Sequence, residues 1–248
     1  MTTASHRPYP PPRSPWIMAM RWSRLLFMHW PVPVEALRPH IPPMLEVDTF
    51  DGSAWLAVVP FTMTGVRARC TPALPGTGAF HELNVRTYVS HEGKPGVWFF
   101  SLDAANRLAV ETARQTFHLA YLNASMSLAE RDGRIEYSSR RTDRRAAEAN
   151  LHCSYRGTSE PRRGSPGTLE SFLTDRYRLY ASELPPASPR RLWVGEIDHD
   201  PWTLSSASCE VQENSMAAPL GLQTPIDQAH LMLAGPVDVR AWRPRRVV

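Results

Sequence analysis

The feature that most constrains the fold of this chain is the alternation of side chains over residues 80–89, FHELNVRTYV. Successive side chains of a β-strand point to opposite faces, so a strand here separates its even-numbered from its odd-numbered residues. One face then carries four polar side chains: Glu82, Asn84, Arg86 and Tyr88. The pattern predicts a strand with one markedly polar face.

The next segment predicts a β-hairpin. Glu92-Gly93 is a typical two-residue turn, and the aromatic run VWFFSLD over 97–103 favours a half-buried returning strand. A two-residue turn would place Glu82 opposite Asp103 and Asn84 opposite Ser101. A bulge at Gly93 would shift this register and separate the two carboxyl groups.

The predicted pair of carboxyl groups suggests acid–base chemistry, with two structural alternatives. Like charges in a poorly solvated place cannot both ionise easily, so one carboxyl should have a raised pKa and carry a proton near neutral pH. Arg86 could instead neutralise Glu82 within a buried network with Asn84 that fixes the strand register. Asp103 could also cap a helix predicted over 104–117.

The rest of the sequence predicts short strands, hairpins and few helices, with no alternation of strands and helices. Strands are expected at 21–30, 44–50, 53–63, 121–129, 134–141, 150–155, 191–197, 207–213 and 237–242, and helices at 34–38, 104–117 and 168–180. This pattern indicates an α+β fold with a mostly antiparallel, closed sheet and two or three flanking helices. The proline-rich residues 1–15 are expected to form a disordered arm before a single domain over 16–248.

Composition excludes several classes of function. The net charge is +4 in 248 residues and Lys94 is the only lysine. The arginine clusters lie in predicted loops without an aromatic platform, so we expect no nucleic-acid partner. Three widely spaced cysteines and the absence of a long apolar run predict a cytoplasmic protein without a membrane segment.

Known catalytic and metal-binding motifs are absent from the sequence. It holds no G-x-S-x-G, H-E-x-x-H, Walker or dinucleotide motif, and no metal-ligand spacing, so we expect neither metal nor cofactor. His29, next to Trp30, and His199, within DHDPW, each lie at a predicted strand end. Each is a candidate for a buried polar anchor or a ligand-pocket residue.

Several long strings resemble one bacterial family. WSRLLFMHWPVPVEALRPHIPPMLEVDTFDGSAWLAVVPF, FHELNVRTYV, GKPGVWFFSLDA, TLESFLTDRY and HDPWTL are similar, in order, to the DUF2071 (YqjF-like) proteins over about residues 18–242. That family is more distantly similar to acetoacetate decarboxylase. The resemblance implies a closed β-barrel of the acetoacetate decarboxylase-like type around a polar cavity.

The same resemblance implies which catalytic groups are kept. Glu82 and the Leu102-Asp103 step match the decarboxylase pattern, but the position of its Schiff-base lysine falls on Ala120-Tyr121-Leu122. An imine mechanism needs an amine of depressed pKa in the cavity, and Lys94 lies at the predicted hairpin turn. A Schiff-base mechanism is therefore excluded.

Two hypotheses for the function are favoured over a third. The first is a cofactor-independent enzyme of lyase or isomerase type, with Glu82 as base, Tyr121 or the Glu82–Asp103 pair as acid, and Arg86 or Arg114 binding a substrate carboxylate or enolate. The second is a non-catalytic small-molecule binder with the same cavity. A structural or nucleic-acid-binding role for the arginine loops is a third hypothesis, ranked last. The remaining candidate ligand-binding residues are Asn84, Tyr88, Ser101 and His29, and a homodimer is compatible with the exposed hairpins.

Overall fold

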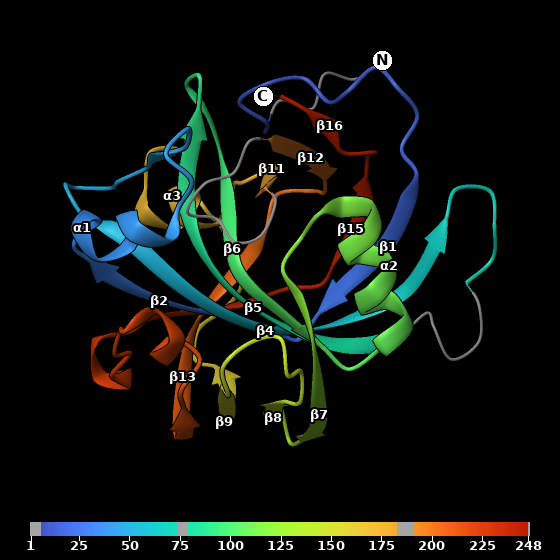
Figure 1. The fold of residues 1–248 in the computed structure, drawn as a ribbon. Helices are drawn as coiled ribbons and strands as arrows, with labels where there is room; N and C mark the ends of the chain where they lie inside the picture. The colour runs from blue at the N-terminus through green and yellow to red at the C-terminus, as the bar shows by residue number, and fades with distance from the viewer. Residues whose placement is uncertain (1–5, 74–78, 183–190, 248) are drawn as a thin grey trace.

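A computed structural model describes residues 6–73, 79–182 and 191–247 of the chain (Figure 1). Within these ranges the strands are β1 (Met18–Ser23), β2 (Leu25–Val32), β3 (Glu46–Val47), β4 (Ala54–Ala68), β5 (Ala79–His91), β6 (Lys94–Ala104), β7 (Tyr121–Arg131), β8 (Arg134–Arg141), β9 (Asn150–Gly157), β10 (Arg162–Arg163), β11 (Arg178–Ser182), β12 (Leu192–Asp198), β13 (Thr203–Asn214), β14 (His230–Ala234), β15 (Val237–Ala241) and β16 (Arg245–Arg246). The α-helices are α1 (Val34–Leu37), α2 (Arg107–Phe117) and α3 (Leu169–Thr174), and the 3₁₀ helices are η1 (Arg38–His40), η2 (Ala218–Leu220) and η3 (Ile226–Gln228). The fold is therefore mostly sheet with few helices, as the sequence predicts.

The sheet is mixed. Hydrogen-bonded pairing runs from β4 through β5, β6, β11, β12, β15 and β1 back to β4, and a second path leads from β6 through β7, β8, β9, β13, β14 and β2 to β4. Most neighbours are antiparallel, but β6 pairs in parallel with both β7 and β11. The connection from β6 to β7 contains α2, because parallel neighbours need a crossover.

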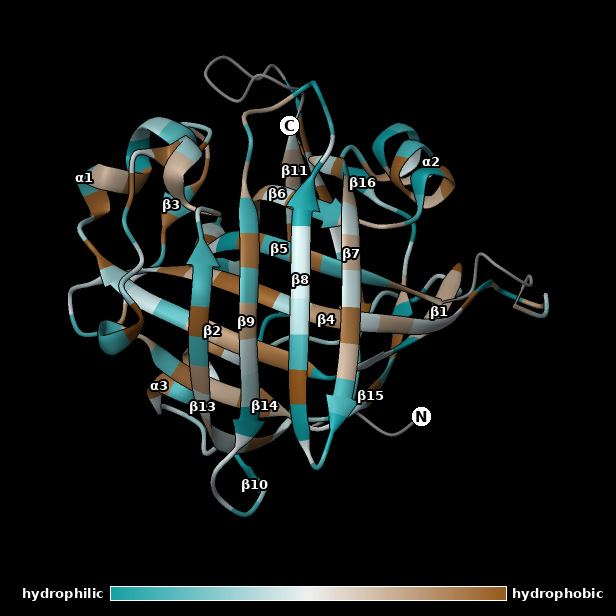
Figure 2. Ribbon diagram, turned by 90° about the horizontal axis from the view of Figure 1, so that it is seen from below, coloured by the Kyte–Doolittle hydropathy of each residue, from teal (hydrophilic) through white to brown (hydrophobic). Residues whose placement is uncertain are grey.

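Strands β4, β5 and β6 are covered on both faces. One face packs with β7, β8, β9 and β13 around a core that includes Val58, Leu83 and Tyr137. The other face packs with β1, β12 and β15 around a core that includes Phe61, Tyr88 and Val239. Figure 2 shows β7, β8, β9 and β13 side by side in front, with β4 and β5 crossing behind them. Burial on both faces explains why β4 is apolar almost throughout.

One predicted strand is two strands. The sequence predicts a single strand over 21–30, but Arg24 takes a positive φ of 53° and divides β1 from β2. Both then pair with the same edge of β4: β2 with residues 54–58 and β1 with residues 62–68. Pro60, which has no N–H to donate, lies between the two pairing regions. This position suits a proline inside a long strand.

The predicted helix over 168–180 is much shorter in the structure. Thr168 caps α3 by accepting a hydrogen bond from the Ser171 amide, and the helix ends at Thr174. The Arg176 side chain donates to the Phe172 carbonyl at 2.7 Å, and residues from Arg178 onward pair as β11. Tyr177 and Tyr180 are both buried, and β11 places Tyr180 in the core through sheet pairing.

Residues 6–15, which the sequence predicts to be part of a disordered arm, contact the sheet. The buried Arg7 guanidinium pairs with Glu196 at 3.2 Å and with Asp198 at 2.9 Å. The Ser14 carbonyl accepts a hydrogen bond from the Trp242 indole at 2.6 Å. The first five residues of the predicted arm lie outside the described residues.

Candidate functional site

The predicted hairpin forms the centre of the candidate site. Glu92 and Gly93 take positive φ values of 51° and 67°, as a two-residue hairpin turn requires, and His91 pairs with Lys94. Strand β5 presents Glu82, Asn84 and Tyr88 to the core shared with β1, β12 and β15, and all three are buried. The polar face predicted from the alternation is therefore an interior face.

The predicted pairing of Glu82 with Asp103 is wrong. The register holds as far as Arg86 and Phe99, and then Val85 pairs with Ser101, so β6 has one extra residue at this point. Glu82 faces Ala104, and Asp103 faces Leu83 on the other side of the sheet. The bulge lies beside Phe100 and not at Gly93. An inserted residue flips every later side chain to the opposite face, which separates the two carboxyl groups.

Asp103 belongs to a buried ion pair on the other face. Arg141 of β8 contacts both carboxylate oxygens of Asp103, at 2.7 Å and 2.8 Å, and donates to the Ser101 hydroxyl at 3.0 Å. Burial raises the pKa of Asp103, and the Arg141 guanidinium opposes this shift. Asp103 does not cap α2, because the Asn106 side chain accepts the hydrogen bond from the Ala109 amide. Asp103 and Ser101 are thus placed apart from Glu82.

Glu82 and Tyr121 meet directly. The Tyr121 hydroxyl donates to Glu82 Oε2 at 2.9 Å, and Glu82 is 2% exposed. Burial raises the pKa of Glu82 to about 8, the Tyr121 hydrogen bond lowers it, and the Asp103 charge adds to the increase. Burial and the Glu82 carboxyl hold the pKa of Tyr121 well above its usual value. Tyr121 therefore stays protonated as a donor, and the pKa of Glu82 lies close to neutral pH.

The register explains why these two side chains meet. Val59, Asn84, Leu102 and Tyr121 form one row across β4, β5, β6 and β7. Glu82 is two residues from Asn84 on the same face, and β6 lies between β5 and β7, so the Tyr121 side chain reaches Glu82 across this face of β6. Arg114 of α2 reaches this region only through the backbone, because it donates to the Tyr121 carbonyl at 2.7 Å. It supports the start of β7 and makes no described contact with Glu82.

Asn84 and Arg86 continue the interior face beyond Glu82. Asn84 Oδ1 and Arg86 Nε are both buried without a hydrogen-bond partner. Arg86 donates from its terminal nitrogen to the Leu173 carbonyl at 3.4 Å, and its guanidinium lies over the Phe27 ring at 5.3 Å. Among the described residues Glu82 and Arg86 form no ion pair, so the predicted neutralisation of Glu82 by Arg86 is not found.

His29 and Tyr88 close the far end of this face. His29 pairs in register with Ala57, which pairs with Arg86, so both polar side chains lie in one row. His29 Nε2 lies 2.6 Å from the Tyr88 hydroxyl, and that hydroxyl donates to the Leu173 carbonyl at 2.9 Å. Burial lowers the pKa of His29 well below its usual value, so the ring is neutral.

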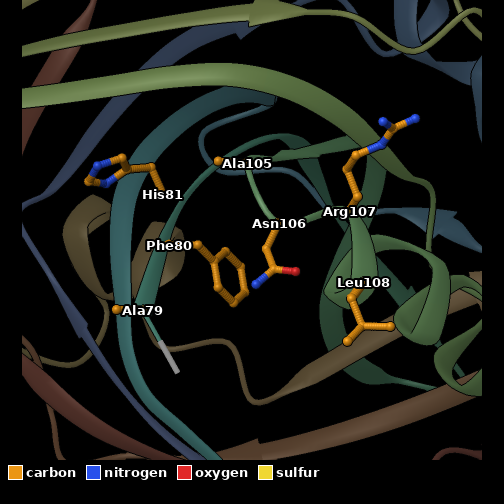
Figure 3. Close-up of a pocket in the computed structure, with 7 residues that line it drawn as sticks. All are labelled: Ala79, Phe80, His81, Ala105, Asn106, Arg107 and Leu108. Atoms are coloured by element: carbon orange, nitrogen blue, oxygen red, sulfur yellow. The ribbon is translucent and has the colours of Figure 1, made fainter. Parts of the chain in front are cut away.

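A pocket of about 530 Å³ lies where β5 and α2 begin (Figure 3). Phe80 and Asn106 face each other across it, and His81 points to the other side of β5. Phe80 pairs with Met63 and Glu82 with Phe61, so Phe80 and Glu82 share the interior face of β5. The pocket therefore adjoins the beginning of the β5 face that carries Glu82, although Glu82 does not line it.

Sequence reasoning missed Arg141 and placed His199 among open alternatives. Burial alternates along β8 so that residues 135, 137, 139 and 141 face inward, which is a strand-period signal that could have identified Arg141 as a core cation. His199 is buried between aromatic rings, its pKa lowered to about 4 by burial, and its Nδ1 bonds the Asp200 carbonyl at 2.7 Å. These contacts favour the buried-anchor alternative.

Three other predictions concern Lys94, metal ligands and membrane segments. Lys94 lies beside the hairpin turn, exposed and 3.7 Å from Glu92. The described residues contain no group of three or more metal-ligating side chains. In the same part of the chain no helix is long and apolar enough to cross a membrane.

Comparisons with known proteins place this geometry in context. The family model DUF2071, an uncharacterized conserved protein, matches residues 19–238. The uncharacterized protein YqjF of Bacillus subtilis (strain 168) is 42% identical over 231 residues, with 93% of each chain covered. The enduracididine biosynthesis enzyme MppR, complexed with pyruvate, is similar with a TM-score of 0.65 and 13% identity over 95% of this chain and 91% of its own. Acetoacetate decarboxylase from Legionella pneumophila subsp. pneumophila str. Philadelphia 1 gives 0.62 and 12% over 99% and 94%. At these low sequence identities, the structural similarity shows that the chain shares the fold of these two enzymes and nothing further.

Proposed function

The chain belongs to the DUF2071 family and shares the acetoacetate decarboxylase-like fold, and from this premise we propose that it is a cofactor-independent enzyme that transfers a proton to or from a small carbonyl or carboxylate compound. The observation that carries the proposal is the state of Glu82. It is buried, its pKa is raised to about 8, and it is bonded to a phenol that stays protonated. A general acid or base works best when its pKa lies near the operating pH.

The proposed step breaks a C–H bond next to the substrate carbonyl. The proton moves to the Glu82 carboxylate, and the electron pair of the bond delocalises into the carbonyl as an enolate. Glu82 returns the proton to the same or a neighbouring atom. Tyr121 orients Glu82 and stabilises its ionised form through the 2.9 Å hydrogen bond. Asp103 takes no part, because Arg141 holds it on the opposite face.

A Schiff-base route is not part of the proposal. The only lysine, Lys94, is exposed and lies beside Glu92 at the tip of the β5–β6 hairpin. Tyr121 occupies the position where the family resemblance places the decarboxylase lysine. The complex of the relative MppR with pyruvate supports a keto acid as the first substrate class to test.

A non-catalytic binding protein is the second candidate. The buried unpaired atoms of Asn84 and Arg86 favour it equally, because a bound ligand would satisfy them with or without chemistry. The two candidates differ in whether the proton on Glu82 exchanges with the ligand.

The test is proton exchange in D₂O, followed by ¹H NMR on a set of small ketones and keto acids. We expect the wild-type protein to exchange protons next to the carbonyl. Glu82→Gln should reduce the rate by about 10²–10⁴-fold, as loss of a general acid–base does. Tyr121→Phe should raise the midpoint of the pH–rate profile, because the Tyr121 hydrogen bond lowers the pKa of Glu82. Glu92→Gln, at the exposed turn, is the matched control and should leave the rate unchanged.

The outcomes separate the candidates. Ligands that raise the melting temperature without any exchange would favour the binding protein. Exchange that persists unchanged in both Glu82→Gln and Tyr121→Phe would reject the assignment of these two residues.

A further inference from the structure

Two buried polar atoms on β5 lack the partners that folded proteins normally provide. Asn84 is 5% exposed, and its Oδ1 has no donor; Arg86 Nε has no acceptor. A buried polar atom left unpaired is costly, so native structures satisfy nearly all of them with protein, water or a ligand. An acceptor and a donor thus stand unpaired two residues apart on the Glu82 face, where a polar ligand group or a water molecule would satisfy them.

Arg86 also differs from the other inward-facing arginines because it has no carboxylate partner. Arg7, Arg141, Arg176 and Arg178, which are all buried, each pair with a carboxylate. Within the described residues no carboxylate lies at ion-pair distance from Arg86, whose guanidinium rests over the rings of Phe27 and Tyr88. A partly buried cation without an anion of its own suits an anionic ligand group, which guanidinium binds well.

The spacing along β5 sets the size of such a ligand. Glu82, Asn84 and Arg86 alternate on one face, and a strand advances roughly 3.3 Å per residue. The carboxyl of Glu82 and the guanidinium of Arg86 are therefore carried by backbone positions about 13 Å apart, with the Asn84 oxygen between them. Arg86 also leans toward Tyr88, away from Glu82. Pyruvate is too short to reach both ends.

We propose that the Glu82 site takes an elongated substrate with a carbonyl at Glu82, a hydroxyl or N–H group donating to Asn84 Oδ1 midway, and a carboxylate bound by Arg86. This inference rests on the proposed function for the chemistry at Glu82, and it adds the length, polarity and charge of the substrate. Along β5, Glu82 lies at the end where the substrate carbonyl reacts, and Arg86 lies at the end where the substrate carboxylate binds.

The test measures affinity by calorimetry for a ladder of keto acids. The probes are pyruvate, 2-oxoglutarate, 2-oxoheptanedioate, the same heptanedioate with a hydroxyl on its middle carbon, and its methyl ester at the carboxylate far from the keto group. We expect the long diacid to bind roughly ten to a hundred times more tightly than pyruvate, as a charge-assisted contact allows. The methyl ester should lose that gain, and the added hydroxyl should increase it.

Variants assign each part of the gain. Arg86→Gln should abolish the preference for the long diacid over pyruvate, and Arg86→Lys should keep part of it. Asn84→Leu should remove only the gain from the hydroxyl. Arg176→Gln is the matched control: Arg176 also lies over the Tyr88 ring but pairs with Asp48, so its loss should leave the length preference intact. The melting temperature of each variant without ligand shows any structural loss, because Arg86 has no carboxylate partner but does contact the Leu173 carbonyl and the Phe27 and Tyr88 rings.

Several results would overturn the inference. These are equal affinity for pyruvate and the long diacid, no binding of any probe, or an Arg86→Gln variant that weakens all probes alike. The proposed function fails separately. Length-dependent binding without proton exchange would reject the proposed proton transfer and keep the proposed binding by Arg86 and Asn84. Proton exchange on short ketones without length dependence would keep the proton transfer and reject the proposed substrate length.

Discussion

Glu82 and Asp103 show how the partner decides what a buried carboxyl can do. Burial raises the pKa of both residues. Arg141 meets Asp103 with two nitrogens at hydrogen-bond distance, so this carboxylate is held in place as part of an ion pair. Glu82 has only the neutral Tyr121 hydroxyl as its partner, so its proton remains exchangeable near neutral pH. The proposed proton transfer therefore uses the carboxyl that has no cation beside it.

The raised pKa of Glu82 predicts a stability that falls with pH. The folded protein keeps the Glu82 proton up to about pH 8, whereas an unfolded glutamate releases it near 4.5. Between these values the folded state binds more protons, so the free energy of unfolding decreases as pH rises, by a few kcal/mol in order of magnitude. Urea unfolding at pH 5 and pH 8.5 should show Glu82→Gln gaining stability relative to wild type at the higher pH. Parallel pH curves for the two proteins would contradict this pKa.

At the scale of elements, the Asp103–Arg141 pair joins β6 to β8. These strands are not hydrogen-bonded neighbours, because β7 lies between them in the sheet. The ion pair therefore ties two strands through side chains, with Arg141 also donating to the Ala147 carbonyl in the loop after β8.

Breaking this tie should be costly. Arg141→Met leaves the Asp103 carboxylate buried without a cation, so we expect a loss of about 3–5 kcal/mol in the free energy of unfolding. The double variant Asp103→Asn, Arg141→Met should lose less than the two single losses combined. Arg140→Met changes the exposed neighbour on the same strand and should stay within about 0.5 kcal/mol. Equal effects of the Arg141 and Arg140 variants in urea unfolding would show that the pair contributes little.

Patterns of neighbouring residues in the sequence predicted individual strands and turns better than they predicted the pairing between strands. The Glu92-Gly93 turn, the side-chain alternation of β5 and the β7–β8 hairpin follow from residues close in sequence, and all three are present. The extra residue beside Phe100 has no sequence mark, because no glycine or proline stands there. The pairing of β11 with β12 and β6 likewise outweighs a helical pattern that looked continuous to Tyr180. Glu82 and Tyr121 were identified as candidates from the sequence, whereas Asp103 was assigned to the wrong partner because of the bulge.

At the scale of the whole molecule, the N-terminal residues contribute contacts that composition conceals. A proline-rich stretch gave no helix or strand signal, yet Arg7 reaches the Ile197 carbonyl at 2.7 Å besides its two carboxylates. Tyr9 packs its ring under the Arg178 guanidinium at 4.1 Å. Residues 6–15 are thus fastened by side chains and not by backbone pairing.

Loss of Arg7 should therefore lower the stability of the whole protein. In Arg7→Gln, Glu196 keeps only Arg178, at 3.4 Å, as its cation. We expect the melting temperature to fall by about 5–10 °C, which corresponds to about 2–3 kcal/mol for a chain of this length. Arg13→Gln, at an exposed position in the same segment, should melt with the wild type. An unchanged melting temperature for Arg7→Gln would return residues 6–15 to the status of a dispensable arm.

The two-sided burial of β4, β5 and β6 has a consequence for how this protein can change over evolution. Val59 and Phe61 face the Glu82 side, and Val58, directly before Val59, faces the Tyr137 side. A substitution that shifts the β4 backbone to reshape one interior is transmitted to the other within a single residue. A change in side-chain packing on one face is thus coupled to repacking on the other face, and successful variants should arise as paired changes on opposite sides of the same strand.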